Sequence, residues 1–119
     1  MEEMAAEYPD VVFLHCSGYK SNDSNYTNYF GKIYEARYLS GLAAGSLTES
    51  NKIGYVAAFP IPEVIRGINA FAVGVKEVNP NATVEVVWTN TWFGPEEETQ
   101  AANALLEACL LYTSDAADD

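Results

Sequence analysis

The sequence predicts an α/β fold: a parallel sheet built from strand–helix–strand crossovers, arranged in three layers as in Rossmann-like domains. Two strands and the helix between them carry this prediction. Residues 53–58 (IGYVAA) are an apolar run without proline or charge, which is typical of a strand buried on both faces. Residues 83–88 (TVEVVW) have the composition of a second strand. A strand–helix–strand unit almost always closes as a right-handed parallel crossover.

The helix between these strands is marked by apolar residues at three- and four-residue spacing. They are Val64, Ile65, Ile68, Phe71, Ala72, Val75 and Val78. Pro62 suits the first turn of a helix, and Glu63 suits the positive end of the helix dipole. Asn79-Pro80 ends the helix. The loops at residues 59–62 and 89–95 are therefore expected on one edge of the sheet, where open α/β folds hold their ligands.

The first part of the chain predicts a short helix end at residues 2–7 and a strand at Val11–Cys16. A polar stretch at residues 20–28 follows, either as a solvated connection or as a linker between two lobes. Residues 29–47 predict a helix with the apolar stripe Phe30, Ile33, Tyr34, Tyr38 and Leu42. The second half of this helix has little bulk and contains two glycines, and each glycine costs about 1 kcal/mol relative to alanine. A close approach of this helix to the sheet is expected to offset that loss.

The last predicted helix covers residues 95–107. Pro95 stands at its start, and three glutamates, Glu96 to Glu98, fill its first turn. Neighbouring positions on a helix point in different directions, so these carboxylates complement the helix dipole rather than form a metal site. The core face is expected from Ala101, Ala104, Leu105 and Ala108. Residues 109–119 do not continue the pattern into the expected third strand and are interpreted as a non-native tail; without them the charge is −8.

Composition limits the classes of function. With 119 residues and 49% hydrophobic content, the chain is long enough for one modest domain. A net charge of −11 with six basic residues argues against a nucleic-acid partner, because binding phosphates needs clustered lysine and arginine. No apolar run approaches the roughly 20 residues of a membrane span. The acidic start lacks a targeting segment. Taken literally, the chain is cytoplasmic; the competing interpretation is an internal fragment whose leader has been lost.

The sequence offers no catalytic group, cofactor motif or metal cluster. Cys16 and Cys109 fit no zinc or redox spacing, and Cys16 is expected as a buried, unreactive thiol in its strand. His15 precedes it, but adjacent strand residues face opposite ways, so a Cys–His dyad is not expected. His15 is expected to be partly buried and hydrogen-bonded. No Gly-x-Gly-x-x-Gly motif follows a strand, which argues against a nucleotide-dependent enzyme.

Several motifs stand in the order found in one known family. They are FLH at residues 13–15, SGYK at 17–20, YEARYLSG at 34–41, IGYVAAFPIPEVIRGINAF at 53–71, NP at 79–80 and VWTNTWF at 87–93. Over about residues 4–108 the chain resembles the basic membrane protein family of ABC-transporter substrate-binding lipoproteins. The resemblance implies a partial type I periplasmic-binding-protein fold, with the ligand held between two lobes. Gly94 departs from the family, which usually has aspartate at this position.

The resemblance also implies an organisation and a function. Residues 1–16 would end the first lobe, residues 17–28 would form a hinge crossing, and residues 29–108 would begin the second lobe. The full-length parent would be a periplasmic or cell-surface lipoprotein of an ABC importer. It would bind a purine nucleoside or related small molecule, deliver it to an ABC permease, and reach the membrane only through a lipid anchor absent from this chain. The alternative is the ligand-sensing domain of a bacterial transcription regulator. The fragment itself is expected to bind ligand weakly.

A purine needs an aromatic surface for its flat face and a few fixed polar groups for its edges. Trp92 is the first candidate for stacking, with Phe93 as the alternate, and Asn90 could contact a base edge or a sugar hydroxyl. The neighbouring loop offers Phe59 and the helix N-terminal amides near Glu63. The crossing strand offers Ser17 and Tyr19. Trp88, at the end of a strand, is expected in the core.

Overall fold

The computed structural model describes residues 1–108 and the backbone of residues 111–114. The chain divides after Lys32 into two compact units. The first unit contains α1 (Glu2–Glu7), β1 (Phe13–Cys16) and β2 (Tyr26–Tyr29). The second unit contains α2 (Ile33–Leu47), β3 (Lys52–Ala57), α3 (Pro62–Val78), β4 (Thr83–Trp88), α4 (Pro95–Glu107) and β5 (Leu111–Ser114). Cys109 and the aspartates of the C-terminal tail lie outside the described residues.

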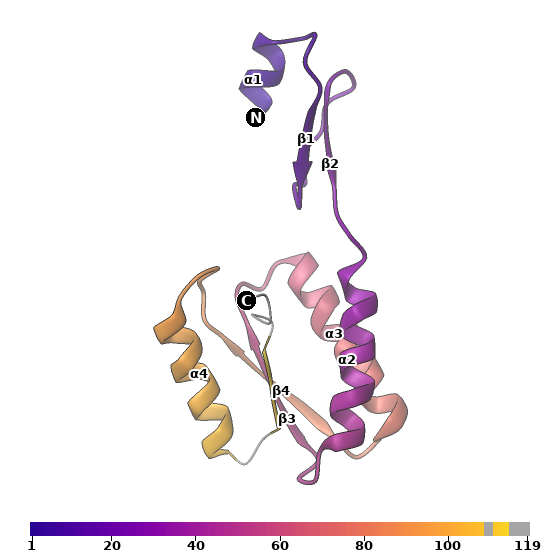
Figure 1. The fold of residues 1–119 in the computed structure, drawn as a ribbon, viewed down its shortest axis with the longest axis vertical. Helices are drawn as coiled ribbons and strands as arrows, with labels where there is room; N and C mark the ends of the chain where they lie inside the picture. Colours follow the sequence, from indigo (N-terminus) through magenta and orange to yellow (C-terminus); the bar gives the residue numbers. More distant parts are fainter. Residues whose placement is uncertain (109–110, 115–119) are drawn as a thin grey trace. The chain divides into compact units, whose positions relative to one another are not determined.

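The second unit is built on a parallel sheet in the order β4-β3-β5. The register aligns Ile53 with Val84 at one end of the β3–β4 pair and Ala57 with Trp88 at the other. Helix α4 lies on one side of this sheet, and α3 with α2 lies on the other (Figure 1). This arrangement confirms the predicted three-layer α/β fold with parallel crossovers.

Alternating residues of β3 pack into two separate hydrophobic cores, one on each face of the sheet. On one face Ile53, Tyr55 and Ala57 pack with Val64, Phe71 and Val75 of α3, and the rings of Tyr55 and Phe71 meet edge to face at 5.2 Å. On the other face Val56 packs with Ala101 and Leu105 of α4. Two buried faces explain why the β3 sequence is apolar throughout instead of alternating.

Helices α2 and α3 meet through glycines. A methyl group at Gly41 would collide with the carbonyl oxygen of Phe71, and one at Gly74 would collide with the carbonyl oxygen of Tyr38. Gly45 likewise lies against Val75. The expectation that the small residues of α2 bring this helix close to the sheet is therefore wrong, because their partner is the backbone of α3. Helix α2 also begins at Ile33 instead of residue 29, which leaves Phe30 outside the helix.

The stretch after α4 also differs from expectation. The sequence predicts no third strand there, yet residues 111–114 pair in parallel with β3, with Leu111 aligned to Ile53. Whether this tail is native remains a prediction. Within α4 itself Ala101 and Leu105 are buried as predicted, whereas Ala104 and Ala108 are exposed.

In the first unit, β1 pairs in parallel with β2. The sequence predicts a polar connection up to residue 28 and a helix from residue 29, so both predictions are wrong for residues 26–29. The buried Asn25 explains the strand: its side-chain amide donates to the carbonyl oxygens of Ala5, Tyr8 and Val11 at 2.8–3.0 Å. The backbone carbonyl oxygen of Asn25 accepts a hydrogen bond from the N–H of Phe13 at 2.7 Å, which aligns the two strands. This hydrogen-bond network joins segments that are far apart in the sequence, so no local sequence pattern predicts it.

Of the two predictions for the end of β1, the one for His15 is confirmed and the one for Cys16 is wrong. His15 is partly buried and its Nδ1 lies 3.2 Å from the hydroxyl of Tyr26, which confirms the prediction for this residue. Cys16 is exposed, so the expected buried thiol is wrong. Two strands and one short helix leave much of the β1 surface uncovered in this unit. The Cys16 side chain instead raises the pKa of the Tyr29 phenol through a hydrogen bond across the strand pair.

Candidate functional site

The two loops at the carboxyl ends of β3 and β4 meet through their aromatic side chains. The ring centroids of Phe59 and Trp92 lie 5.2 Å apart, with the ring planes tilted by 52°. Because β3 and β4 are parallel, their carboxyl ends share one edge of the sheet, and the loops that follow them are neighbours. The geometry expected from the sequence is confirmed, while the role of these residues in binding remains a prediction.

The loop after β4 is held in place by backbone and threonine hydrogen bonds. The amides of Thr89 and Asn90 donate to the carbonyl oxygens of Ala57 and Ala58, each at 2.9 Å, which extends the strand pairing beyond β4. The hydroxyl of Thr91 accepts from the amide of Phe93 at 3.2 Å. Sequence reasoning missed this support, and its signal is the hydroxyl residue two positions before Phe93, which is typical of a local turn.

Asn90 has a left-handed backbone conformation, with φ of 56°. Asparagine tolerates this conformation better than most residues with a side chain. The same residue is exposed, so its amide is available to solvent at the rim. The identity of Asn90 is therefore explained in part by the turn, and any contact with a ligand would be additional.

The aromatic side chains of the loop remain open to solvent. Trp92 is 64% exposed and Phe93 is 87% exposed, while Phe59 is partly buried. Large aromatic rings exposed together commonly mark a binding surface. Phe59 contacts one side of Trp92, so the rest of the indole surface is available for a planar ligand to stack on.

The neighbouring loop leads directly into α3. The N-cap residue is Ile61, no side chain caps the helix, and Pro62 occupies the first turn. The amides of the first turn, next to the partly buried Glu63, can therefore donate to a ligand. This geometry is consistent with the helix N-terminus expected beside Phe59.

Trp88 and Gly94 lie on either side of the loop after β4. Trp88 is 36% exposed, so the expected core position is wrong; β4 lies at an edge of the described sheet, which leaves one side of the strand open. Gly94 is buried and precedes α4 without a side-chain cap. A side chain at Gly94 would press on the methyl group of Thr91 and the carboxylate of Glu97. The departure from aspartate at this position therefore fits the tight local packing.

Ser17 and Tyr19 belong to the first unit. Ser17 follows β1 with φ of 62°, and its amide donates to the carbonyl oxygen of Tyr29 at 2.8 Å. Tyr19 is 88% exposed. The approach of these two residues to the Phe59–Trp92 pair remains a prediction.

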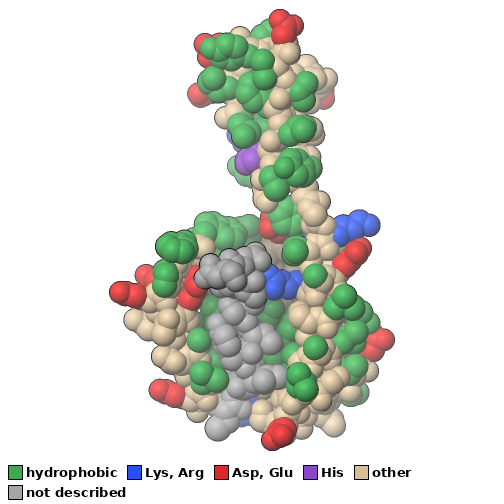
Figure 2. Space-filling view, in the orientation of Figure 1, with side chains coloured by type: hydrophobic (Ala, Val, Ile, Leu, Met, Phe, Trp, Pro, Cys, Tyr) green, Lys and Arg blue, Asp and Glu red, His purple; other side chains and the backbone are tan. Residues whose placement is uncertain are grey.

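Charge around the second unit is mainly acidic. Acidic side chains gather over the start of α4, where Glu96, Glu97 and Glu98 occupy the first turn (Figure 2). Within residues 1–108 and 111–114, no group of three or more histidine, cysteine, aspartate or glutamate side chains is placed to hold a metal ion. No helix in this part of the chain is long and apolar enough to cross a membrane.

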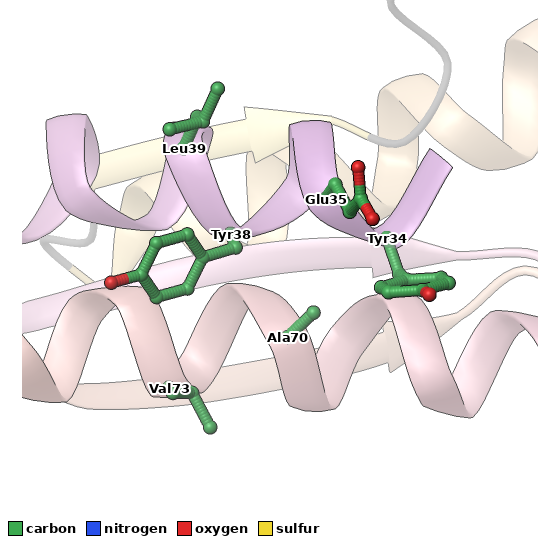
Figure 3. Close-up of a pocket in the computed structure, with 6 residues that line it drawn as sticks. All are labelled: Tyr34, Glu35, Tyr38, Leu39, Ala70 and Val73. Carbon is green, nitrogen blue, oxygen red and sulfur yellow. The ribbon is translucent and has the colours of Figure 1, made fainter. Parts of the chain in front are cut away.

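A groove that sequence reasoning missed runs along the outer surface of α2 and α3. It has a volume of about 500 Å³. Figure 3 shows the residues that line it: Tyr34, Glu35, Tyr38 and Leu39 from α2, and Ala70 and Val73 from α3. The groove lies along the bodies of the helices instead of at the carboxyl ends of the strands, and its lining is almost entirely apolar. These features distinguish it from the polar and aromatic rim around Trp92.

Comparison with known proteins identifies the family. Residues 1–110 match the family Bmp, described as ABC transporter substrate-binding protein PnrA-like. A putative ABC transporter glucose-binding protein from Haloferax volcanii is 55% identical over 90% of this chain and 27% of its own length. A purine-binding protein from Brucella abortus is 42% identical over 88% of this chain and 30% of its own length. The chain therefore spans less than a third of the length of these relatives.

A solved structure agrees with these matches. The solute-binding protein of an ABC transporter system from Conexibacter woesei superposes with a TM-score of 0.68 and 27% sequence identity, covering 95% of this chain and 39% of that one. The agreement supports a partial periplasmic-binding fold for this chain. The chain belongs to the Bmp family of PnrA-like ABC-transporter substrate-binding proteins.

Proposed function

We propose that this chain is a segment of the solute-binding component of an ABC importer and that its Phe59–Trp92 rim forms one wall of the ligand site. The single observation that carries the proposal is the ring contact between Phe59 and Trp92 at the shared carboxyl edge of two parallel strands. Ligands of open α/β folds bind at this edge. The family match supports this importer role over the ligand-sensing domain of a regulator.

The proposed ligand is a purine nucleoside or a related purine. The exposed surface of Trp92 offers a stacking platform, Asn90 offers an amide donor and acceptor, and the first turn of α3 offers backbone donors. A flat heterocycle with polar edges uses all three. The 42% identical relative named as a purine-binding protein supports this choice.

A hexose is the second candidate, because the relative with 55% identity is named as a putative glucose-binding protein. The apolar face of a pyranose ring also stacks on indole, and its hydroxyls pair with amides. The two candidates use the same platform in different ways. A purine gains from aromatic stacking on both of its faces, whereas a sugar depends more on its ring of hydrogen bonds.

The rest of the proposal concerns the complete protein. Residues 1–16 end the first lobe, residues 17–28 form a hinge crossing, and residues 29–108 begin the second lobe. Ser17 and Tyr19 then approach the ligand from the crossing, and closure of the two lobes traps it. The complete protein acts outside the membrane as a periplasmic or cell-surface lipoprotein held by a lipid anchor, and it delivers the ligand to an ABC permease. The present chain, with part of one wall, binds weakly.

The test is a thermal-shift screen of the complete protein that contains this segment, with purines, nucleosides and hexoses. We expect a purine nucleoside to raise the melting temperature and the Trp92→Ala variant to lose that response. Leu39→Ala is the matched control, because Leu39 is as exposed as Trp92 but lies on the outer surface of α2. A response to glucose but not to purines would replace the purine proposal with the sugar. An unchanged response in Trp92→Ala would remove this residue from the site.

A further inference from the structure

The outer surface of α3 carries a stripe of four residues with an ordered change of charge. Arg66, Ala70, Val73 and Glu77 are spaced by four, three and four positions, so they lie on one face of the helix. The stripe is positive near the start of α3, apolar in the middle and negative near the end. Ala70 and Val73 also line the groove between α2 and α3 (Figure 3).

Each charged end of the stripe rests on a tyrosine of α2. The guanidinium carbon of Arg66 lies 5.6 Å from the ring centroid of Tyr34. The carboxylate of Glu77 accepts a hydrogen bond from the hydroxyl of Tyr38 at 2.5 Å. These contacts restrain both charges beside the groove. A restrained charge loses less side-chain entropy when it pairs with an opposite charge.

The middle of this surface exposes more apolar area than the core pattern of the helices requires. Val73 is 58% exposed and Leu39, across the groove on α2, is 62% exposed. Hydrophobic side chains are visible at the surface over α2 (Figure 2). An apolar patch rimmed by polar groups is typical of a protein interface.

We propose that this surface binds a second copy of the chain, with the two α3 helices antiparallel about a two-fold axis that passes between Phe71 and Ala72. Positions 66 and 77 are equidistant from that axis, and so are positions 70 and 73. Arg66 therefore faces Glu77 of the partner subunit, and Ala70 faces Val73 of the partner subunit. With a rise of about 1.5 Å per residue, the two ion pairs lie roughly 16 Å apart and flank the apolar centre.

The order of the charges along α3 favours a second copy of the chain as the partner on this surface. A two-fold interface places the same patch of both copies in contact, so the patch must be complementary to itself. A stripe with opposite charges at its ends meets that condition in the antiparallel arrangement, whereas a parallel arrangement would oppose like charges. The net charge of −11 on each copy disfavours random association, so pairing of the restrained Arg66 and Glu77 is needed to orient the two copies.

The experiment measures the mass of the 119-residue chain by analytical ultracentrifugation as a function of concentration. We expect the mass to move from 13.0 kDa toward twice that value. R66E places glutamate opposite Glu77 of the partner subunit, and E77R places arginine opposite Arg66 of the partner subunit. Each variant is expected to weaken dimerisation at least about tenfold. An equimolar mixture of R66E and E77R is expected to dimerise as heterodimers, because both of its pairs are attractive again.

Further variants separate the interface from folding. The double variant R66E/E77R restores opposite charges across the two-fold axis and is expected to dimerise within about threefold of the wild type. Tyr38→Phe removes the hydrogen bond that restrains Glu77 and keeps the charge, so it is expected to weaken dimerisation by no more than about threefold, far less than either charge reversal. Circular dichroism verifies that every variant is folded. A chain that remains at 13.0 kDa at all concentrations would overturn the proposal and leave the groove to another occupant, as would single variants that dimerise like the wild type.

Discussion

The ring of Phe59 lies 5.2 Å from the ring of Trp92, although the two residues follow different strands. The parallel register of β3 and β4 produces this contact, because it aligns Ala57 with Trp88 at the carboxyl ends of both strands. The loops after β3 and β4 therefore begin side by side at the same edge of the sheet. The amides of Thr89 and Asn90 fix the second loop against the first at 2.9 Å. The relation between the two rings is thus a direct consequence of the crossover.

The contact between α2 and α3 predicts opposite effects for two glycines of one helix. Gly74→Ala places a methyl group against the carbonyl oxygen of Tyr38, so we expect it to lower the free energy of unfolding by about 1–3 kcal/mol. Gly67→Ala is the matched control in α3, since its methyl group would lie 3.7 Å from the side chain of Arg37. We expect it to raise stability by about 0.5–1 kcal/mol. Urea denaturation measures both, and equal effects would contradict the close helix contact.

The left-handed backbone of Asn90 allows its structural role to be separated from a ligand contact. Asn90→Val should destabilise the chain by about 1–2 kcal/mol, because a branched side chain is strained at a φ of 56°. Asn90→Gly accepts that φ and removes the amide group. We expect Asn90→Gly to unfold like the wild type in thermal denaturation and to bind ligand more weakly in a titration. Unchanged ligand affinity in Asn90→Gly would show that the amide serves the turn alone.

Asn25 predicts a local loss of order in the first unit. Asn25→Ala leaves the carbonyl oxygens of Ala5, Tyr8 and Val11 without their donor, which should cost about 1–3 kcal/mol. Hydrogen exchange should report the loss as faster exchange of the amides in β1 and β2. Asn28→Ala, which removes a single exposed bond to the carbonyl oxygen of Lys20, is the control. Equal exchange in the two variants would contradict a central role for Asn25.

The hydrogen bond from Tyr38 to Glu77 predicts a dependence of stability on alkaline pH. It raises the pKa of the Tyr38 phenol above the ordinary value of 10.0. A raised pKa in the folded state means that the contribution is fully present below pH 10.0 and is lost as the pH rises through the folded value. We expect the stability difference between wild type and Tyr38→Phe to be constant at neutral pH and to shrink above pH 10.0. Melting temperatures from pH 7 to about pH 11.5 measure it, and a difference that persists at the alkaline end would contradict the assignment.

The parts of the fold that follow local rules could be predicted from the sequence. The bounds of α3 and α4 agree with prediction, because proline at the first turn and apolar residues at helical spacing mark each helix. The Phe59–Trp92 edge could be predicted as well, since parallel crossovers place consecutive loops together. These features depend on the order of residues within one crossover unit.

The remaining features depend on contacts between distant segments. The sequence of α2 indicates a close approach but does not say whether Gly41 meets the sheet or α3. Strand β2 has no alternating pattern and depends on the amide of Asn25. The apolar groove combines Leu39 and Val73, which lie off the predicted core stripes of their helices. Such features require the tertiary structure.

The most direct test of the shared rim is a heteronuclear NMR titration of the 119-residue chain with adenosine at millimolar concentration. Weak binding at one wall should shift the indole N–H of Trp92 and the backbone amides of residues 59–63 and 89–93. Trp92→Ala should abolish the shifts at the remaining residues, whereas Leu39→Ala should leave them unchanged. Shifts centred on Tyr34 and Tyr38 in the groove, or no shifts at the rim at any concentration, would contradict the assignment of Phe59 and Trp92 to the ligand site.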